Sequence, residues 1–283
     1  MPELRLRGGA LDGLSLHYLV QGRGPVVALV HGLGGFAASW GPTMEALSGR
    51  ATVLALDLPG FGRSAKPRAR YGLELFASAL EGFLGALGVG QVGLVGHSLG
   101  ASIALTYALT HPGRVDRLAF VGGLVPGFAY RMSPIYRALA LPGVGEALAL
   151  CGCAAVYRAA LARCFHSPRA EEIAFLVSCD YPARTDWSAR AAYLSTVRAM
   201  REDYEARGPE YRRALRAFPT PMLMIHGRQD PVVPAAHCQE IGRDLPRAET
   251  RWVDACGHFP HLEHPEPVNG WLGEFLVARP AAR

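Results

Sequence analysis

The sequence has little lysine and no dense block of basic residues. Lys66 is the only lysine among 29 basic residues, and the arginines are spread along all 283 positions. Nucleic-acid-binding surfaces usually show clustered basic residues with interleaved aromatics. We therefore interpret the net charge of +5 as an arginine-rich solvated surface and expect no nucleic-acid partner.

Long apolar runs are also missing. The sequence has no uncharged apolar run of about 18 residues, which predicts no integral membrane segment. The first residues, "MPELRLRGGALDGLSLHYLV", carry scattered charges and lack the apolar stretch of a secretory signal. The six cysteines are not spaced as a compact disulfide framework. These absences favour a protein of the reducing cytoplasm.

No cofactor motif stands out in the sequence. The glycines of "GLGG" at 32–35 lack the spacing of a dinucleotide-binding fingerprint. The alternative is a zinc cluster of Cys151, Cys153, Cys164 and His166. Only one residue separates Cys151 from Cys153, which is a shorter spacing than in most structural zinc sites. We therefore predict no metal site and no cofactor. We expect the partner to be a small-molecule substrate.

What is present is enough apolar sequence for a large core, arranged in alternating strands and helices. Half of the residues are hydrophobic. Strands are expected at 14–20, 26–30, 51–60, 91–97, 114–123, 222–227 and 250–254. Helices are expected at 73–89, 101–113, 235–243 and 266–278. Between 124 and 213 the pattern is helical with no convincing buried strand. This predicts an α/β fold whose mostly parallel sheet is built from residues 1–123 and 214–283, with a helical cap inserted at 124–213.

A short glycine-containing motif ends one of the expected strands. Gly96-His97-Ser98-Leu99-Gly100 has the pattern G-x-S-x-G, with an apolar strand before it and a helix after it. A tight turn at this junction strains the serine and exposes its hydroxyl group, and the two glycines let neighbouring backbone approach. Ser98 is therefore the candidate nucleophile.

A serine is a poor nucleophile unless a base removes its proton. His258 lies in "DACGHFPHLEHPE", after the last expected strand, and loops that follow parallel strands gather at one edge of the sheet. His261 and His264 are nearer to the terminal helix, and we interpret them as capping and packing residues. His237 is interpreted as a residue of a surface helix. His258 is the predicted base.

An acid should follow a strand between the serine and the histidine. Asp230 does so in "MLMIHGRQDPVVP", where it would hold the imidazole of His258 in the required tautomer. Asp254 is the alternative, but it lies only four residues before His258. Asp57 is interpreted as a residue that orders its own loop.

The order Ser98, Asp230, His258 is the order expected of α/β-hydrolases. The sequence resembles that superfamily across nearly the whole chain, and the resemblance is carried by "HGLGG" (31–35), "DLPGFGRS" (57–64), "GHSLG" (96–100), "GRQDPVVP" (227–234) and "GHFPHLEHPE" (257–266). It implies an eight-stranded, mostly parallel sheet with a helical cap after the sixth strand. It also implies that the backbone N–H groups of Leu33 and Leu99 form the oxyanion hole.

The resemblance leaves several chemistries to compare. A serine at the motif's centre argues against the haloalkane dehalogenases and epoxide hydrolases of this fold, which use aspartate. Hydrolases of C–C bonds usually carry Asn before the serine and Trp after the histidine, where this chain has His97 and Phe259. We assign both of these residues to the substrate pocket.

A serine hydrolase of a carboxylic ester is the function that these residues favour. Its substrate is expected to be small and largely apolar, because the cap is rich in Ala, Leu, Phe and Tyr. The alternatives are a C–C bond or lactone hydrolase of the same fold, and a non-hydrolytic ligand-binding or cyclase member that retains the three residues.

Overall fold

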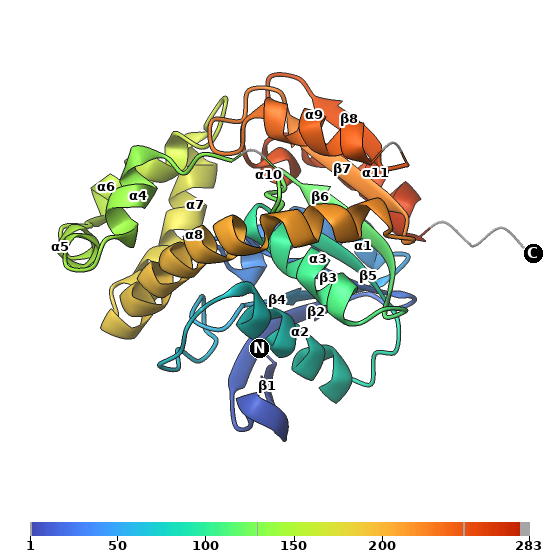
Figure 1. Cartoon of the computed structure of the whole chain (residues 1–283), viewed down its shortest axis with the longest axis horizontal. Coiled ribbons are helices and arrows are strands. Elements are labelled where there is room, and N and C mark those ends of the chain that lie inside the picture. Colours follow the sequence, from blue (N-terminus) through green and yellow to red (C-terminus); the bar gives the residue numbers. More distant parts are fainter. Residues whose placement is uncertain (1, 129, 246, 278–283) are drawn as a thin grey trace, which may run out of the picture.

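The computed structural model describes residues 2–128, 130–245 and 247–277 (Figure 1). Eight strands form one sheet in the order β1-β2-β4-β3-β5-β6-β7-β8. Their bounds are β1 Glu3–Arg5, β2 Ser15–Gln21, β3 Val26–Val30, β4 Thr52–Leu56, β5 Val92–His97, β6 Val115–Val121, β7 Met222–Gly227 and β8 Glu249–Val253. Strand β2 pairs antiparallel with β1 and β4, and the other neighbours are parallel, which confirms the mostly parallel eight-stranded sheet.

Strand β5 lies in the interior of the sheet. It pairs with β3 on one side, where Val30 faces Gly96, and with β6 on the other, where Val121 faces His97. Every residue of β5 and β7 is buried. Parallel strands covered by helices on both faces have such continuous apolar runs. The end of β5 is therefore held from both sides.

Helices cover both faces of the sheet (Figure 1). On one face lie α1 (Gly41–Ser48) and α11 (Pro265–Val277), which share a buried apolar cluster with β3 and β8. The other face carries α2 (Leu73–Ala86), α3 (Leu99–Thr110) and α9 (Ala235–Asp244), which share a second and larger cluster. The short helices are η1 (Gly9–Leu11), η2 (Ala37–Trp40) and α10 (Pro260–Glu263).

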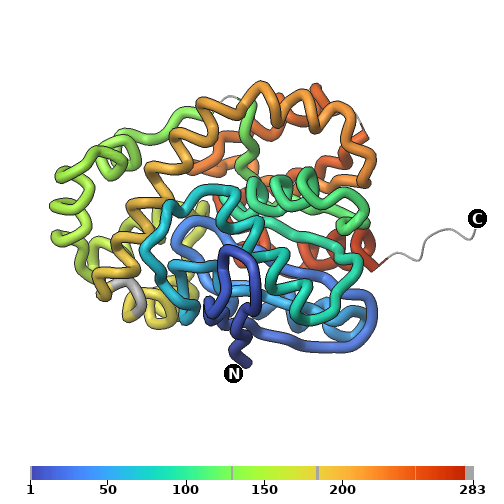
Figure 2. The backbone as a smooth tube through the Cα atoms, turned by 60° about the horizontal axis from the view of Figure 1, so that its bottom comes forward, coloured from blue at the N-terminus to red at the C-terminus, as the bar shows by residue number. Residues whose placement is uncertain are grey.

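Five helices lie between β6 and β7. They are α4 (Pro134–Ala140), α5 (Val144–Leu150), α6 (Ala154–Ala162), α7 (Ala170–Arg184) and α8 (Trp187–Arg216), and we call them the cap helices. Figures 1 and 2 place α4 to α7 to one side of the sheet, with α8 running back from them over the core. In the described part of the chain, no single helix is long and apolar enough to cross a membrane.

Helix α8 continues through Pro209 to Arg216, so the predicted limit of the insertion at 213 falls within its last turn. Its last turns pack on the core. Tyr211 is buried there, and its hydroxyl group lies 2.7 Å from the hydroxyl oxygen of Thr106 on α3. The structure therefore makes α8 one continuous element that joins the cap helices to the core.

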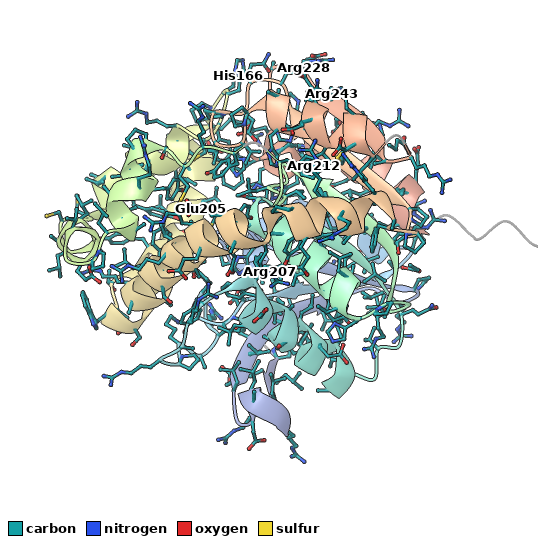
Figure 3. All side chains as sticks on the ribbon, in the orientation of Figure 1. His166, Glu205, Arg207, Arg212, Arg228 and Arg243 are labelled. Carbon is teal, nitrogen blue, oxygen red and sulfur yellow. The ribbon has the colours of Figure 1, made fainter. Side chains whose placement is uncertain are left out.

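Arginines are scattered over the surface of α8 and of the region around β7 and α9, as the labelled Arg207, Arg212, Arg228 and Arg243 show in Figure 3. Several of these arginines have carboxylate partners. The Arg207 guanidinium lies 2.9 Å from Glu74, and that of Arg212 lies 3.0 Å from Glu240. These pairs account for part of the chain's high arginine content.

Candidate active site

Ser98 lies at the sharp turn between β5 and α3. Its backbone has φ 52° and ψ −121°, a conformation that residues with a side chain rarely adopt. Three backbone hydrogen bonds hold it there. The Ser98 N–H donates to Val121 O (3.2 Å), and its carbonyl oxygen accepts from the N–H groups of Ala101 (3.0 Å) and Leu124 (3.1 Å). The strained turn is thus held by the first turn of α3 and by the end of β6 with the loop that follows it.

The glycines on either side of Ser98 are required by close backbone approach. A Cβ atom on Gly100 would overlap the carbonyl oxygen of Val30 on β3. A Cβ atom on Gly96 would overlap the carbonyl group of Gly100 itself. This is the close approach that the sequence motif predicts.

His258 and Asp230 meet at the same edge of the sheet, each in the loop that follows a strand. The His258 Nδ1 atom lies 2.8 Å from Asp230 Oδ2, and both side chains are buried. The other carboxylate oxygen, Oδ1, accepts from the N–H groups of Val232 (2.7 Å) and Val233 (2.8 Å). Burial alone would raise the pKa of Asp230, but the attraction of His258 and the hydrogen bond from its ring outweigh burial and lower it. The ionised carboxylate keeps a proton on Nδ1 and leaves Nε2 to accept one.

The alternative acid and bases lie elsewhere. The Asp254 side chain is 83% exposed and pairs with Arg228 at 2.6 Å. His261 is buried and stacked on Trp40, with ring centroids 4.3 Å apart, and burial lowers its pKa to about 3. The ring of His264 hydrogen-bonds to a backbone carbonyl oxygen. None of the three lies next to Asp230 in the way that His258 does.

The backbone of His258 is held on both sides. Its N–H donates to the carbonyl oxygen of Cys164, just after α6, at 2.8 Å. Its carbonyl oxygen accepts from His97 Nε2 at 2.8 Å. Burial and the neighbouring imidazoles keep the pKa of His97 well below its usual value, so His97 is neutral and carries its proton on Nε2.

Glu263, a residue that sequence reasoning did not single out, ties the His258 loop to the cap. Its Oε1 atom accepts from Gly257 N–H at 2.9 Å, and its Oε2 atom accepts from His166 N–H at 2.8 Å. Beside it, Phe165 stacks on Phe259 with ring centroids 4.8 Å apart. The segment after α6 therefore packs directly against the residues on both sides of His258.

The two predicted oxyanion residues lie in the segments that meet at Ser98. Leu99 is the first residue of α3, and the first N–H groups of a helix have no partner within it. Leu33 lies in the loop after β3 and lines the cavity that contains Ser98. A Cβ atom on Gly32, the residue before it, would lie 2.9 Å from the Ser98 Cβ atom. The Leu33 loop therefore packs closely against the serine.

Two buried side chains fix the loops around this site. His31 accepts from Leu58 N–H at 3.0 Å through Nε2, so its Nδ1 carries the proton and donates to Gly32 O at 2.8 Å. Asp57 accepts from the N–H group of Ala37 and, within its own loop, from that of Arg63 at 2.9 Å, as its position indicated. Sequence reasoning gave no structural role to His31, although it begins the "HGLGG" motif.

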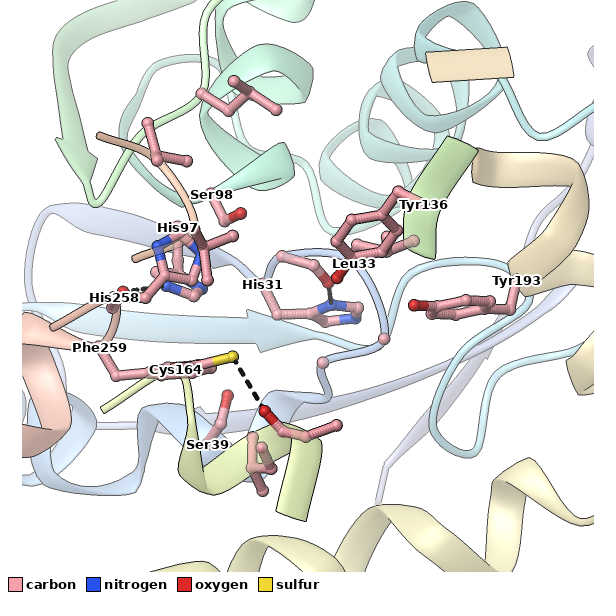
Figure 4. A pocket seen from close by; sticks show the side chains of 18 of the residues that line it. His31, Leu33, Ser39, His97, Ser98, Tyr136, Cys164, Tyr193, His258 and Phe259 are labelled. Atoms are coloured by element: carbon pink, nitrogen blue, oxygen red, sulfur yellow. Dashed lines mark hydrogen bonds between the residues drawn. The ribbon is translucent and has the colours of Figure 1, made fainter. Parts of the chain in front are cut away.

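The catalytic cavity, as we call the cavity that contains Ser98 and His258, has a volume of about 180 Å³. His97 and Phe259 both line it, next to His258. Tyrosines from the insertion form much of the remaining wall: Tyr130, Tyr136, Tyr157 and Tyr193. Figure 4 shows Ser98 and His258 at one side of this cavity and Tyr136 and Tyr193 at the other. The role of these tyrosines was not predicted. The only indication of it in the sequence was that the insertion is rich in Tyr.

The cysteines do not gather around a metal position. Cys151 and Cys153 are exposed and Cys164 is half-buried. Within the ranges that the structure describes, no group of three or more His, Cys, Asp or Glu side chains is arranged to hold a metal ion.

The model of the family described as "Alpha/beta hydrolase family" matches residues 27–271. This chain belongs to the α/β-hydrolase family. The hydrolase is 29% identical over 280 residues to the 2-hydroxy-6-oxo-6-(2'-aminophenyl)hexa-2,4-dienoic acid hydrolase of Metapseudomonas resinovorans, covering 94% of this chain and 89% of that protein.

Solved structures show the same fold. The hydrolase superposes on the 2-hydroxy-6-oxo-6-phenylhexa-2,4-dienoate hydrolase of Rhodococcus sp. strain RHA1 with a TM-score of 0.82 and 26% identity, covering 98% of this chain and 99% of that one. An esterase from Exiguobacterium antarcticum gives a TM-score of 0.81 at 20% identity, covering 97% of this chain and 98% of that one. The similar proteins thus include hydrolases of dienoic acids and an esterase on one fold.

Proposed function

We propose that this hydrolase cleaves carboxylic esters of small, largely apolar substrates through an acyl-enzyme on Ser98. His258 acts as the general base and Asp230 holds its tautomer. The backbone N–H groups of Leu33 and Leu99 receive the oxyanion, and the cap of residues 124–213 sets specificity. The observation that carries the proposal is the 2.8 Å pair of His258 and Asp230 at the cavity that the strained Ser98 lines.

The reaction follows from these positions. His258 Nε2 takes the proton of the Ser98 hydroxyl as Oγ bonds to the ester carbonyl carbon, and the N–H groups of Leu33 and Leu99 stabilise the oxyanion. The imidazolium then gives that proton to the leaving alkoxide, which departs as the alcohol. Water attacks the acyl-enzyme with His258 again as base, and the acid is released with Ser98 reprotonated.

The lining of the catalytic cavity favours an ester over a dienoate. Dienoic acid substrates, which the names of the similar proteins specify, carry a carboxylate that a buried site would have to pair. Among the described residues that line this cavity there is no Lys or Arg. Neutral aromatic and aliphatic side chains make up most of its wall, and these suit an uncharged ester group.

Hydrolysis of a C–C bond is the second candidate, because the dienoic acid hydrolase and this chain are similar over most of both lengths. The test compares the turnover of 2-hydroxymuconate semialdehyde with that of p-nitrophenyl acetate. Turnover of the semialdehyde is measured as the loss of its absorbance. A kcat/KM that is higher for the semialdehyde than for the ester would replace the ester proposal with this one.

Labelling with a fluorophosphonate probe tests the proposed nucleophile. We expect labelling and p-nitrophenyl acetate turnover in the wild type and in the control Ser78→Ala, whose serine is exposed on α2. Ser98→Ala should show neither while keeping its melting temperature, since it removes one hydroxyl group. Labelling of Ser98→Ala would contradict the assignment. A folded wild type with neither labelling nor turnover would favour a ligand-binding protein, to be tested by ligand-dependent melting shifts.

A further inference from the structure

A second cavity lies among the cap helices, and we call it the cap chamber. Its volume is about 380 Å³, about twice that of the catalytic cavity. Helices α4, α5, α6 and α8 and the loop after β4 contribute to its wall. Much of the wall is aliphatic and is made by Ile135, Leu139, Leu148, Ala149, Val156 and Ala189.

The cap chamber adjoins the catalytic cavity. Tyr157, Ala160 and Tyr193 line both of them. Tyr157 is fixed in this shared wall, because its hydroxyl group donates to the buried Asp180 Oδ2 at 2.6 Å. Ala160 follows Tyr157 by about one turn of α6 and therefore lies on the same side of that helix. The two cavities are therefore neighbours on this shared wall, and Ala160 is its smallest side chain.

The charged groups of the cap chamber already have partners on the protein. The Lys66 amine donates to Gly62 O (2.9 Å) and Ser64 O (3.1 Å). Burial lowers the pKa of Lys66, and the carboxylates of Asp186, Asp57 and Asp180 oppose this shift. These oxygens already surround the Lys66 amine, so we assign the preference of the cap chamber to its aliphatic wall.

Part of that aliphatic wall remains in contact with water. Ile135 is 55% exposed, Leu148 is 38% exposed and Val156 is 57% exposed, and all three line the cap chamber. An alkyl chain in the cap chamber would remove apolar surface from water on both the chain and these side chains, which is favourable. The cap chamber is thus a largely apolar cavity that shares a wall with the cavity of the reacting serine.

We propose that the cap chamber binds a straight alkyl chain of the ester whose carbonyl group reacts at Ser98. Among small esters, the preferred substrate class is then a medium-chain acyl ester whose chain is too long for the catalytic cavity alone. This inference rests on the proposed ester hydrolysis, so its test separates chain binding from the reaction itself.

A bulky residue in the cap chamber provides the test. Ala149→Trp fills the cap chamber from α5, and Ala149 does not line the catalytic cavity. Ala147→Trp is the matched control, because Ala147 is exposed on the same helix and lines neither cavity. The substrates are p-nitrophenyl acetate and p-nitrophenyl octanoate, both kept below the concentration at which the octanoate forms micelles.

We expect the wild type to prefer the octanoate by kcat/KM. Ala149→Trp should lower kcat/KM for the octanoate by at least about tenfold, since each lost methylene contact in an apolar pocket costs about that factor or more. Its turnover of the acetate should stay at the wild-type value, and Ala147→Trp should change neither. Equal loss on both esters, or no loss on either, would overturn the proposal.

Two further arms separate the possible failures. The hemi-ester p-nitrophenyl suberate has the octanoate chain length but ends in a carboxylate. Faster turnover of the suberate than of the octanoate would assign the cap chamber to an anionic group at Lys66 or Arg190 instead. Hexyl acetate places the chain on the alcohol side, and a loss in Ala149→Trp confined to hexyl acetate would assign the cap chamber to the leaving group.

Calorimetric binding of 1-octanol to Ser98→Ala tests the cap chamber without any turnover. We expect binding that Ala149→Trp weakens and Ala147→Trp does not, each combined with Ser98→Ala. If the esters are not hydrolysed but this binding pattern holds, the ester proposal fails and chain binding stands. If acetate is hydrolysed but 1-octanol does not bind, the chain proposal fails and ester hydrolysis stands.

Discussion

Replacing Asp230 by asparagine should disable His258 without unfolding the protein. In the native site, Asp230 Oδ1 accepts two hydrogen bonds, from the N–H groups of Val232 and Val233. These two donors hold the oxygen of the new amide in place of Oδ1. Its NH₂ group then faces His258 Nδ1, which must accept a hydrogen bond instead of donating one. The ring proton moves to Nε2, where it blocks removal of the serine proton.

The size of the effect follows from the cost of turning the amide around. A flipped asparagine would restore the correct histidine tautomer, but it would set its NH₂ group against two buried N–H donors. Each unsatisfied buried group costs about 1–3 kcal/mol, so the flip costs about 2–6 kcal/mol in total. The kcat of Asp230→Asn should therefore fall by a factor between roughly 30 and 25,000.

The assay is steady-state hydrolysis of p-nitrophenyl acetate, with the melting temperature measured by circular dichroism as a check on folding. Asp254→Asn is the matched control, because its side chain is exposed and pairs only with Arg228 among the interactions described above. We expect wild-type turnover from this control. A folded Asp230→Asn enzyme with wild-type kcat, or a crippled Asp254→Asn enzyme, would refute the assignment of the acid.

Three further predictions concern the residues around the site. Gly100→Ala should lower the free energy of unfolding in urea by about 1–3 kcal/mol, because its methyl group overlaps a β3 carbonyl oxygen; unchanged stability would contradict that close approach. Glu263→Ala should lower kcat more than it raises KM, because Glu263 positions the loop that carries His258, and Glu263→Gln should recover part of the loss. Burial lowers the pKa of His261 in the folded state to about 3, while its unfolded pKa is about 6.5. The unfolded state therefore takes up a proton first as the pH falls, and the free energy of unfolding decreases between about pH 6.5 and pH 3. His261→Phe should therefore lose less unfolding free energy between pH 7 and pH 5 than the wild type, and an equal loss in both would argue against this.

The strands of the interior were the easiest elements to predict. The expected strand at 26–30 coincides with β3, because a strand buried on both faces is a continuous apolar run. Strand β1 was missed, since Glu3–Arg5 is a charged, three-residue edge strand. Helix α1 was missed as well, because it is short and begins with Gly41-Pro42 directly after a glycine-rich loop. Sequence periodicity is weakest where an element is short or lies at an edge.

Exposure of single side chains was harder to predict than the elements that carry them. Helix α9 was expected at 235–243 and is observed at Ala235–Asp244, but the expectation of a surface position for His237 is wrong. His237 is buried and its Nε2 atom accepts from Val125 N–H at 3.1 Å. Val125 lies over a hundred residues away from His237 in sequence, so no local sequence pattern predicts this contact. The cap tyrosines were not predicted for the same reason, because only the folded insertion places them in the cavity that contains Ser98.

The site is divided between two regions that differ in how tightly they are packed. Ser98 stands between β5, which is buried throughout, and α3, most of which is buried. Such surroundings can hold a strained backbone that costs about 1–3 kcal/mol. By contrast, α6 has no buried residue, although Tyr157 and Ala160 on it line the catalytic cavity. Substitutions on α6 therefore meet few packing constraints, and they can change the shape of the cavity wall without disturbing the serine. Dienoic acid hydrolases and an esterase share this fold, so the fold alone does not select the substrate. Under the proposed function, this division assigns that selection to the cap lining more than to the serine and its partners.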